Sequence, residues 1–245
     1  MRIIENLILA LLLALSTTAC GGEGQSAPSA APAEGALEVH YIDVGQADSA
    51  LILCGGESML IDGGNVADSS LVVSYLADQG VDSLDYVVCT HAHEDHVGGL
   101  SGPLSQYPAE HVFAPVTEYD TKAFENFLKY TRQQGLEVTS PSPGDTWTVG
   151  DASVTVLGPL KAYEDTNNTS IVLRLDYGET SFLFTGDAER DAEADMLEAG
   201  AALQADVLKV GHHGSNTSTS YPFLRSMPSS PWGRGTTTGI PMRRP

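Results

Sequence analysis

The amino-acid sequence predicts one α/β domain, and three observations support this fold class. Short β-branched or alternating segments bounded by glycines are typical of strands. Longer segments with apolar residues at helical spacing lie between them. Acidic and histidine side chains follow three of the expected strands directly, at the strand ends where α/β folds place their chemistry. We therefore expect a layered α/β fold with a functional site at one sheet edge.

The expected elements follow one another in a mixed order. In the first half, residues 37–45, 49–54 and 58–64 are expected as strands of a meander, residues 68–80 as a helix, and residues 84–90 as a strand buried on both faces. In the second half, residues 121–135 and 188–200 are expected as helices. The remaining expected strands are residues 147–150, 152–158, 170–178, 180–186 and 206–211, and the last of these is expected to be buried.

The amino-terminal region precedes the domain. An apolar run behind Arg2 is too short to span a bilayer and ends in small residues, so residues 1–19 are expected to be a secretion signal. The approach to Cys20 resembles a bacterial lipobox, although Thr17 stands where leucine is usual. The resemblance implies cleavage before Cys20 and lipidation of its thiol, which would anchor the protein to the outer face of the bacterial cell membrane. Cleavage nearby by an ordinary peptidase, with release of the protein, is the alternative.

Composition sets the domain limits and the expected partners. Residues 20–35 are rich in Gly, Ser, Ala and Pro and are expected to form a flexible tether, so the domain covers residues 36–224. The net charge of -20 disfavours long-range attraction of a polyanion such as DNA, although bound metal ions could reverse the sign locally. Cys54 and Cys89 could pair in an oxidising compartment, and the sequence leaves this open.

A metal-binding motif occupies residues 91–96, which read HAHEDH. Three of the chain's seven histidines and two carboxylates lie within these six positions. The chance of such a pattern arising at random in a chain of this length is on the order of 1 in 10,000. Imidazole and carboxylate are ligands that zinc and similar divalent ions prefer. Asp187 and the pair His212-His213, which follow two later strands, add donors of the same type.

Other polar residues have simpler interpretations. Asp43 and Asp62 stand beside glycines and are expected in Asx turns, although Asp62 could also lie behind a metal ligand. His40 and His111 are isolated and are expected to be ordinary surface or packing histidines. The acidic run over residues 189–198 is expected to be the solvated face of a helix.

Six segments together carry a family resemblance: YIDVGQADSALI, LIDGG, THAHEDHVGGL, TGDAE, LKVGHHGSNTS and, more weakly, NNTSIVL. On these residues the chain resembles the metallo-β-lactamase superfamily. Within it, the chain is most similar to the branch that holds the extracytoplasmic domain of ComEC-type competence proteins and related secreted phosphodiesterases. The resemblance covers residues 37–224 and implies a four-layered αββα sandwich with a two-metal site along one edge.

The resemblance also implies a role for each site residue. One metal would be held by His91 and His93, the other by Asp95, His96 and His213, with Asp187 bridging both. His212 would face the substrate, to contact a phosphate or to protonate the leaving group, and the two adjacent histidines could exchange roles. Asn168 stands where many family members have a further histidine, which leaves the first metal a more open position. Asp95, Asn168 and His212 are thus the expected catalytic residues.

The expected cofactor is two divalent ions, zinc or alternatively manganese. A site with two such ions predicts a hydrolase. Metals about 4 Å apart lower the pKa of a bound water and stabilise both oxygens of an in-line displacement. This chemistry suits phosphodiesters, and it also suits lactones and thioesters. The leading expectation is a nuclease-like phosphodiesterase related to competence proteins, with DNA as a possible substrate. The alternatives are hydrolysis of cell-wall choline phosphate or another small ester, and a catalytically impaired metal-binding lipoprotein.

The C-terminal tail departs from the family pattern. After Asp206 the chain has no acidic residue, although acidic residues are frequent before it. Members of this branch continue with a segment close to PKYAVISVGPGNDYGHPHEA. Written in GC-rich codons and read one base out of frame, that segment yields SMPSSPWGRGTTTGIPMRR, which is residues 226–244. We therefore expect a frameshift near Leu224 or Arg225, an out-of-frame or disordered tail over residues 225–245, and loss of the C-terminal strand with the histidine of its GHP turn.

Overall fold

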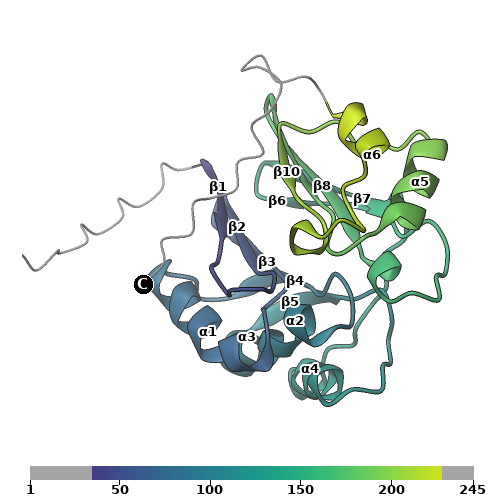
Figure 1. The fold of residues 1–245 in the computed structure, drawn as a ribbon. Coiled ribbons are helices and arrows are strands. Elements are labelled where there is room, and N and C mark those ends of the chain that lie inside the picture. Colours follow the sequence, from purple (N-terminus) through teal and green to yellow (C-terminus); the bar gives the residue numbers. More distant parts are fainter. Residues whose placement is uncertain (1–34, 228–245) are drawn as a thin grey trace, which may run out of the picture. The chain divides into compact units, whose positions relative to one another are not determined.

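The computed structural model describes residues 35–227, which form two five-stranded β-sheets (Figure 1). The first sheet has the order β1-β2-β3-β4-β5 and the second the order β10-β9-β8-β7-β6. The strands of the first sheet are β1 (Leu37–Tyr41), β2 (Ala50–Cys54), β3 (Glu57–Ile61), β4 (Leu84–Val88) and β5 (Ala109–Phe113). Those of the second are β6 (Thr146–Val149), β7 (Ala152–Gly158), β8 (Val172–Tyr177), β9 (Thr180–Phe184) and β10 (Val207–Lys209).

Helices cover the outer face of each sheet (Figure 1). The first sheet is covered by α1 (Ser69–Asp78), α2 (Glu94–Val97), α3 (Ser101–Gln106) and α4 (Lys122–Gln133). The second is covered by α5 (Arg190–Glu198) and α6 (Tyr221–Ser226). This is the four-layered αββα sandwich that the family resemblance predicts.

Each of the three spaces between layers holds its own buried apolar cluster. Phe124 and Phe127 of α4 pack on the outer face of the first sheet. Side chains such as Ile52, Met59 and Leu173 fill the space between the two sheets, and a third cluster lies under α5 and α6. Alternation along β2 explains the division, since Leu51 belongs to the first cluster and Ile52 to the second. The period-two pattern of the strands thus determines the layering.

The connections turn several strand ends toward one edge. β1 to β3 form an antiparallel meander, and β4 pairs with both β3 and β5 in parallel. In the second sheet, β10 runs parallel to β9 after the α5 crossover. The carboxyl ends of β3, β4, β9 and β10 are therefore followed by the segments that contain Asp62, residues 91–96, Asp187 and the two adjacent histidines.

Two glycine-rich loops make a close backbone contact at this edge. A Cβ atom on Gly99 would lie 1.8 Å from the carbonyl oxygen of Gly63, and one on Gly63 would lie 2.5 Å from the nitrogen of Leu100. Only glycine fits both positions, because any side chain would separate the loops. This contact explains the paired glycines of LIDGG and HVGGL, and it brings the loop after β3 against the loop that carries the HAHEDH motif.

Most expected elements are present, with some differences. β5, α3 and α6 were not predicted, because these short segments interrupt their apolar patterns with charged or polar residues or with proline. Residues 206–211 do contain a strand, β10, but the expectation that this strand is buried is wrong. In the described part of the chain, β10 is an outermost strand of only three residues, and Val207 is 36% exposed.

Three further expectations are resolved by the packing. Cys54 and Cys89 are free and buried in different clusters, so they do not pair. His40 contacts Tyr75 and Glu38, and His111 stacks on Tyr86, as expected of ordinary packing histidines.

Residues 35–227 contain no helix that is long and apolar enough to cross a membrane. The expected signal, most of the tether and residues 228–245 of the expected out-of-frame tail lie outside the described residues. The expected domain boundary at residue 224 falls inside α6.

Candidate metal centre

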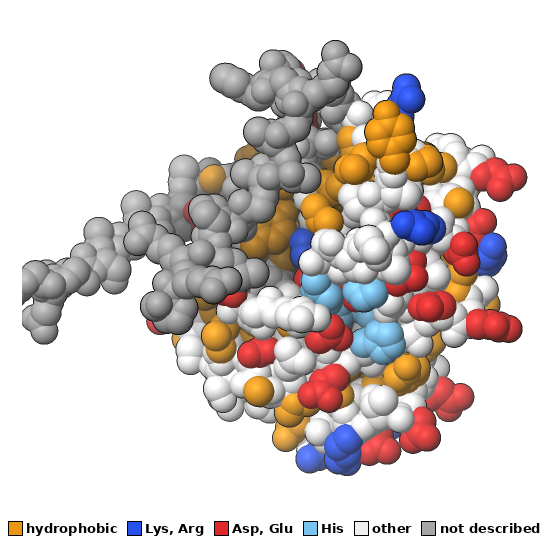
Figure 2. Space-filling model, viewed as in Figure 1, with side chains coloured by type: hydrophobic (Ala, Val, Ile, Leu, Met, Phe, Trp, Pro, Cys, Tyr) orange, Lys and Arg blue, Asp and Glu red, His pale blue; other side chains and the backbone are white. Residues whose placement is uncertain are grey.

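The predicted ligands gather at one edge of the two sheets. His91 and His93 follow β4, and Asp95 and His96 lie in α2 immediately after them. Asp187 follows β9, and the two adjacent histidines follow β10. Figure 2 shows histidine side chains together on one face, with acidic side chains around them. The expectation that separate strand ends would meet is confirmed.

The carboxylate of Asp187 stands at the centre of this group. Its Oδ2 lies 3.8 Å from Nε2 of His91 and 3.4 Å from Nε2 of His213. Its Oδ1 lies 3.3 Å from Nε2 of His96. Both Asp187 and the ring of His96 are buried, so the two carboxylate oxygens face different histidines inside the protein.

Two sets of donor atoms flank Asp187. On one side, Nε2 of His91 lies 3.1 Å from Nδ1 of His93. On the other side, Nε2 of His213 lies 3.1 Å from Oδ2 of Asp95. Atoms that bind one zinc ion at about 2.0–2.2 Å lie roughly 3–4 Å from each other. The spacing therefore fits two groups, His91 with His93 and Asp95 with His213, and the family resemblance implies that His96 joins the second group.

Unpaired buried atoms support metal binding. Nε2 of His96 and Oδ1 of Asp187 are both buried, and neither has a hydrogen-bond partner of good geometry within residues 35–227. A buried polar atom without a partner costs about 1–3 kcal/mol, so such atoms call for an explanation. A cation held between them would satisfy both atoms.

The electrostatics of the cluster also favour a cation. Burial disfavours the charged form of His96, but the carboxylates of Asp62 and Asp187 outweigh it and raise the pKa of His96 to about 10. Hydrogen bonds to Asp187, Asp48 and Asp95 raise the pKa of His213 to about 11. The carboxylates thus create a negative potential that retains protons on these rings, and a divalent cation can replace those protons.

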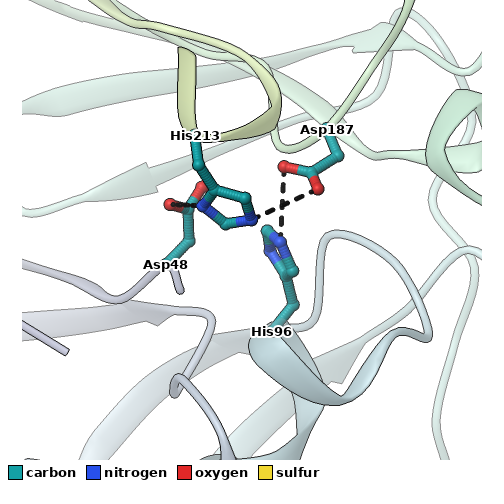
Figure 3. Close-up of side chains that lie close together, drawn as sticks. All are labelled: Asp48, His96, Asp187 and His213. Carbon is teal, nitrogen blue, oxygen red and sulfur yellow. Dashed lines mark ion pairs between the residues drawn. The ribbon is translucent and has the colours of Figure 1, made fainter. Parts of the chain in front are cut away.

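A second carboxylate stands behind each of two ligand histidines. Oδ2 of Asp62 lies 2.8 Å from Nδ1 of His96. Oδ1 of Asp48 lies 3.2 Å from Nδ1 of His213 (Figure 3). Nε2 of each ring is thereby turned toward Asp187. Carboxylates in this position orient a metal-binding imidazole and raise its basicity.

Asp62 was expected in an Asx turn, and that expectation is wrong. Its carboxylate accepts hydrogen bonds from the backbone nitrogen and hydroxyl of Thr90, far along the chain, as well as contacting His96. The alternative interpretation, that Asp62 lies behind a ligand, is confirmed. Asp43 does form the expected turn, since its Oδ1 accepts a hydrogen bond from the nitrogen of Gly45.

Asp48 was not predicted as a site residue. One donor atom each from Asp48, His96, Asp187 and His213 lies within 4.8 Å of the others. Its Oδ2 also lies 2.6 Å from Nζ of Lys209, so the carboxylate is shared between that ammonium group and His213. The signal in the sequence was its place in YIDVGQADSALI, a segment that carries the family resemblance but contains no predicted ligand.

The two adjacent histidines differ in their surroundings. His213 contacts Asp48, Asp95 and Asp187 and belongs to the ligand cluster. Nε2 of His212 lies further from Asp187, at 3.9 Å from Oδ2, and its side chain is 29% exposed. Both residues have positive φ angles, 47° and 50°. Such strain costs on the order of 1–3 kcal/mol per residue and is typical of functional sites.

Asn168 is buried beside the start of α5. Its side-chain oxygen accepts hydrogen bonds from the backbone nitrogens of Glu189 and Ala192, at 3.0 and 3.2 Å. The oxygen is therefore used at the amino-terminal end of α5. Asn168 thus fixes the start of this helix, and its expected role at the first metal stays a prediction.

The same fold and motifs occur in a known family. The family model described as "Metallo-beta-lactamase superfamily" matches residues 42–230, which include every predicted metal ligand. The chain belongs to the metallo-β-lactamase superfamily. It is accordingly a metal-dependent hydrolase, and the superfamily's divalent metals are expected in the cluster around Asp187.

The chain is similar to several curated proteins, one of which is named as a competence protein. The chain is 29% identical to ComE operon protein 3 of Bacillus subtilis, over 78% of this chain and 27% of that protein. It is 33% identical to Recombination protein 2 of Haemophilus influenzae, over 76% of this chain and 22% of that protein. It is 30% identical to Competence protein ComA of Neisseria gonorrhoeae, over 82% of this chain and 27% of that protein. The chain thus spans about a quarter of the length of these relatives.

Solved structures support the fold. Metallo-β-lactamase SMB-1, bound to 2-mercaptoethanesulfonate, aligns with a TM-score of 0.52 and 19% identity, over 71% of this chain and 76% of that chain. The subclass B3 enzyme MEM-A1, from a soil metagenome library, aligns with a TM-score of 0.51 and 19% identity over the same shares. At 19% identity, these alignments show that the two structures share the αββα sandwich fold with this chain.

Proposed function

We propose that the chain is a phosphodiesterase that uses two metal ions. The observation that carries this proposal is the position of Asp187, whose carboxylate lies between the His91 and His93 pair and the Asp95, His96 and His213 set. When bound, two divalent ions would supply an activated water and charge stabilisation for both oxygens of an in-line displacement. Zinc suits the nitrogen-rich donors, and manganese is the alternative.

The protein's own residues would hold and orient this chemistry. Asp48 and Asp62 keep the rings of His213 and His96 in one orientation, since each carboxylate holds Nδ1 and turns Nε2 toward Asp187. His212 is partly exposed beside the carboxylate of Asp187 and can contact an oxygen of the substrate. Asp95 reaches His213 from the loop after β4 and would join the metal-binding set.

Relatives named for competence and recombination favour a nucleic-acid backbone as substrate. The net charge of -20 favours the second candidate, a small phosphodiester such as choline phosphate on a cell-wall polymer. Only 12 basic residues stand against 32 acidic ones, so long-range attraction of DNA would depend on the metal charges.

A substrate panel tests this function. The purified chain, supplied with zinc or manganese, is expected to hydrolyse bis(p-nitrophenyl) phosphate and either single-stranded DNA or p-nitrophenyl phosphorylcholine. Chelation with EDTA is expected to abolish the rate, and nitrocefin, a β-lactam, is expected to remain intact. Faster turnover of the β-lactam or of a thioester than of every phosphodiester would contradict the proposal. The ratio of the DNA rate to the phosphorylcholine rate decides between the two candidates.

We also propose that the protein is a lipoprotein on the outer face of the cell membrane. Replacing Cys20 by serine is expected to release it into the medium, because the following residues have no large apolar side chain to hold it. Fractionation of cells followed by immunoblotting measures this, with Ser26→Ala as a control that leaves the cysteine intact. A Cys20→Ser protein that stays with the membrane would show that the segment before it is retained.

A further inference from the structure

Three histidines at the site have the same arrangement of contacts. Each has a carboxylate within hydrogen-bonding distance of Nδ1 and has Nε2 near Asp187. Two of these pairs, Asp62 with His96 and Asp48 with His213, support predicted metal ligands. The third pair is Glu189 with His212, in which Oε1 lies 2.9 Å from Nδ1. Nothing in the metal centre requires this third pair.

Glu189 is itself firmly held in position. Its Oε1 accepts hydrogen bonds from the hydroxyl of Thr217 at 2.8 Å and from Nδ2 of Asn167 at 3.2 Å. The Thr217 hydroxyl also lies 3.0 Å from Nδ1 of His212. Asn168 accepts a hydrogen bond from the backbone nitrogen of Glu189. The NNTS segment therefore fixes both the backbone and the side chain of Glu189.

The loop that carries His212 is fixed to the same helix. The acidic run on α5 was expected to be a solvated face. Asp191 and Glu198 are exposed as expected, but Glu193 is buried. Its carboxylate accepts hydrogen bonds from the backbone nitrogens of Thr219 and Ser220. The hydroxyl of Ser218 donates to the carbonyl oxygen of Ala188 at 2.8 Å. Glu189 and His212 thus lie on two segments that cannot shift independently.

These contacts determine where His212 points. Glu189 holds Nδ1 of His212. The other ring nitrogen, Nε2, therefore faces Asp187 and lies 3.9 Å from its Oδ2. The side chain is 29% exposed, whereas the ring of His96 is fully buried, so His212 is open to a molecule that arrives beside Asp187. A carboxylate on one ring nitrogen fixes both the orientation and the proton arrangement of an imidazole.

We propose that Glu189 is a positioning residue: its carboxylate holds the Nδ1 proton of His212 and directs Nε2 toward the leaving oxygen of the substrate, to which the doubly protonated ring donates a hydrogen bond. This inference rests on the proposed phosphodiesterase function. The three carboxylate–histidine pairs then have different roles. Asp48 and Asp62 strengthen metal binding through His213 and His96, whereas Glu189 positions His212 toward the substrate. The role of Glu189 also gives the NNTS segment a function, namely to support the substrate-facing histidine from behind.

The test compares Glu189→Gln with Asp48→Asn, a matched loss of charge behind the neighbouring histidine. The Asp48→Asn variant is expected to bind metal about 10- to 100-fold more weakly. The Glu189→Gln variant is expected to keep two metals with unchanged affinity, measured by isothermal titration with zinc. Its kcat is expected to fall about 10- to 100-fold for a phenyl or alkyl phosphodiester, with KM unchanged. The p-nitrophenyl ester is expected to change little, because its leaving group needs no donor.

Two further variants and a spectrum keep the proposal testable. Glu189→Asp is expected to recover part of the rate on poor leaving groups, and Thr217→Val to lose a smaller part of it, without a change in melting temperature. In ¹⁵N-edited spectra of the wild-type protein, the Nδ1 proton of His212 is expected to be resolved and protected from exchange, and it is expected to be lost in Glu189→Gln.

The outcomes separate this proposal from the proposed function. If the Glu189→Gln variant loses a metal, His212 is a ligand and the proposal is overturned. Equal loss of rate on good and poor leaving groups would also overturn it. If the wild-type protein hydrolyses no phosphodiester, the proposed function fails. The His212 spectrum still tests the Glu189 contact in that case, and an unchanged Nδ1 signal in Glu189→Gln would refute it.

Discussion

Replacing Asp187 by alanine is expected to remove both metal ions and to abolish hydrolysis. The two oxygens of this carboxylate face different histidines, so its loss disturbs both halves of the centre. It also leaves His91 and His96 buried without their common acceptor. Loss of metal-derived charge stabilisation of about 4 kcal/mol corresponds to a rate lower by about 1,000-fold or more.

Elemental analysis and the rate on bis(p-nitrophenyl) phosphate measure this effect. The His212→Ala variant is the informative comparison, because it should keep both metals and a larger residual rate. Asp43→Asn is the control, since Asp43 lies in an exposed turn and contacts only the nitrogen of Gly45. Equal residual rates for Asp187→Ala and His212→Ala, or one metal in the wild-type protein, would refute the two-metal assignment.

Restoring the expected reading frame after Leu224 should raise both stability and rate. Within the described residues β10 is an outermost strand and Val207 is 36% exposed, so a further strand has an edge to pair with. A strand reading AVISV would bury several large apolar side chains, each worth about 1.5–3 kcal/mol when fully buried. Folded domains are stable by only about 5–15 kcal/mol, so the gain is a large fraction of the total.

The restored segment also contains the histidine of the expected GHP turn. A donor aligned with developing charge contributes about 10- to 1,000-fold in rate. Thermal unfolding and the rate on bis(p-nitrophenyl) phosphate are measured for the present and the restored chains. A restored chain with that histidine changed to alanine should keep the higher melting temperature but lose the added rate. If restoration changes neither quantity, the tail as written is the native one.

The sequence by itself determined the fold family and predicted the residues that gather at the candidate metal centre. The HAHEDH motif places four donors within six residues, and an extended segment that leads into a helical turn brings them together locally. Alternating and continuous apolar segments predicted where most strands lie, but not that β10 would be a partly exposed outermost strand. These features depend on neighbours a few residues apart, which is the range over which a sequence pattern is informative.

Only the tertiary structure decided which polar groups stand behind those ligands. Asp62 contacts Thr90 and His96, and Asp48 contacts His213, across long separations in the chain. The same is true of the pairing of Glu189 with His212. A carboxylate beside a glycine has the same local sequence whether it closes an Asx turn or orients a distant imidazole. Close packing of the loops after β3 and β4, possible because Gly63 and Gly99 lack side chains, brings Asp62 to His96 and excludes the local alternative.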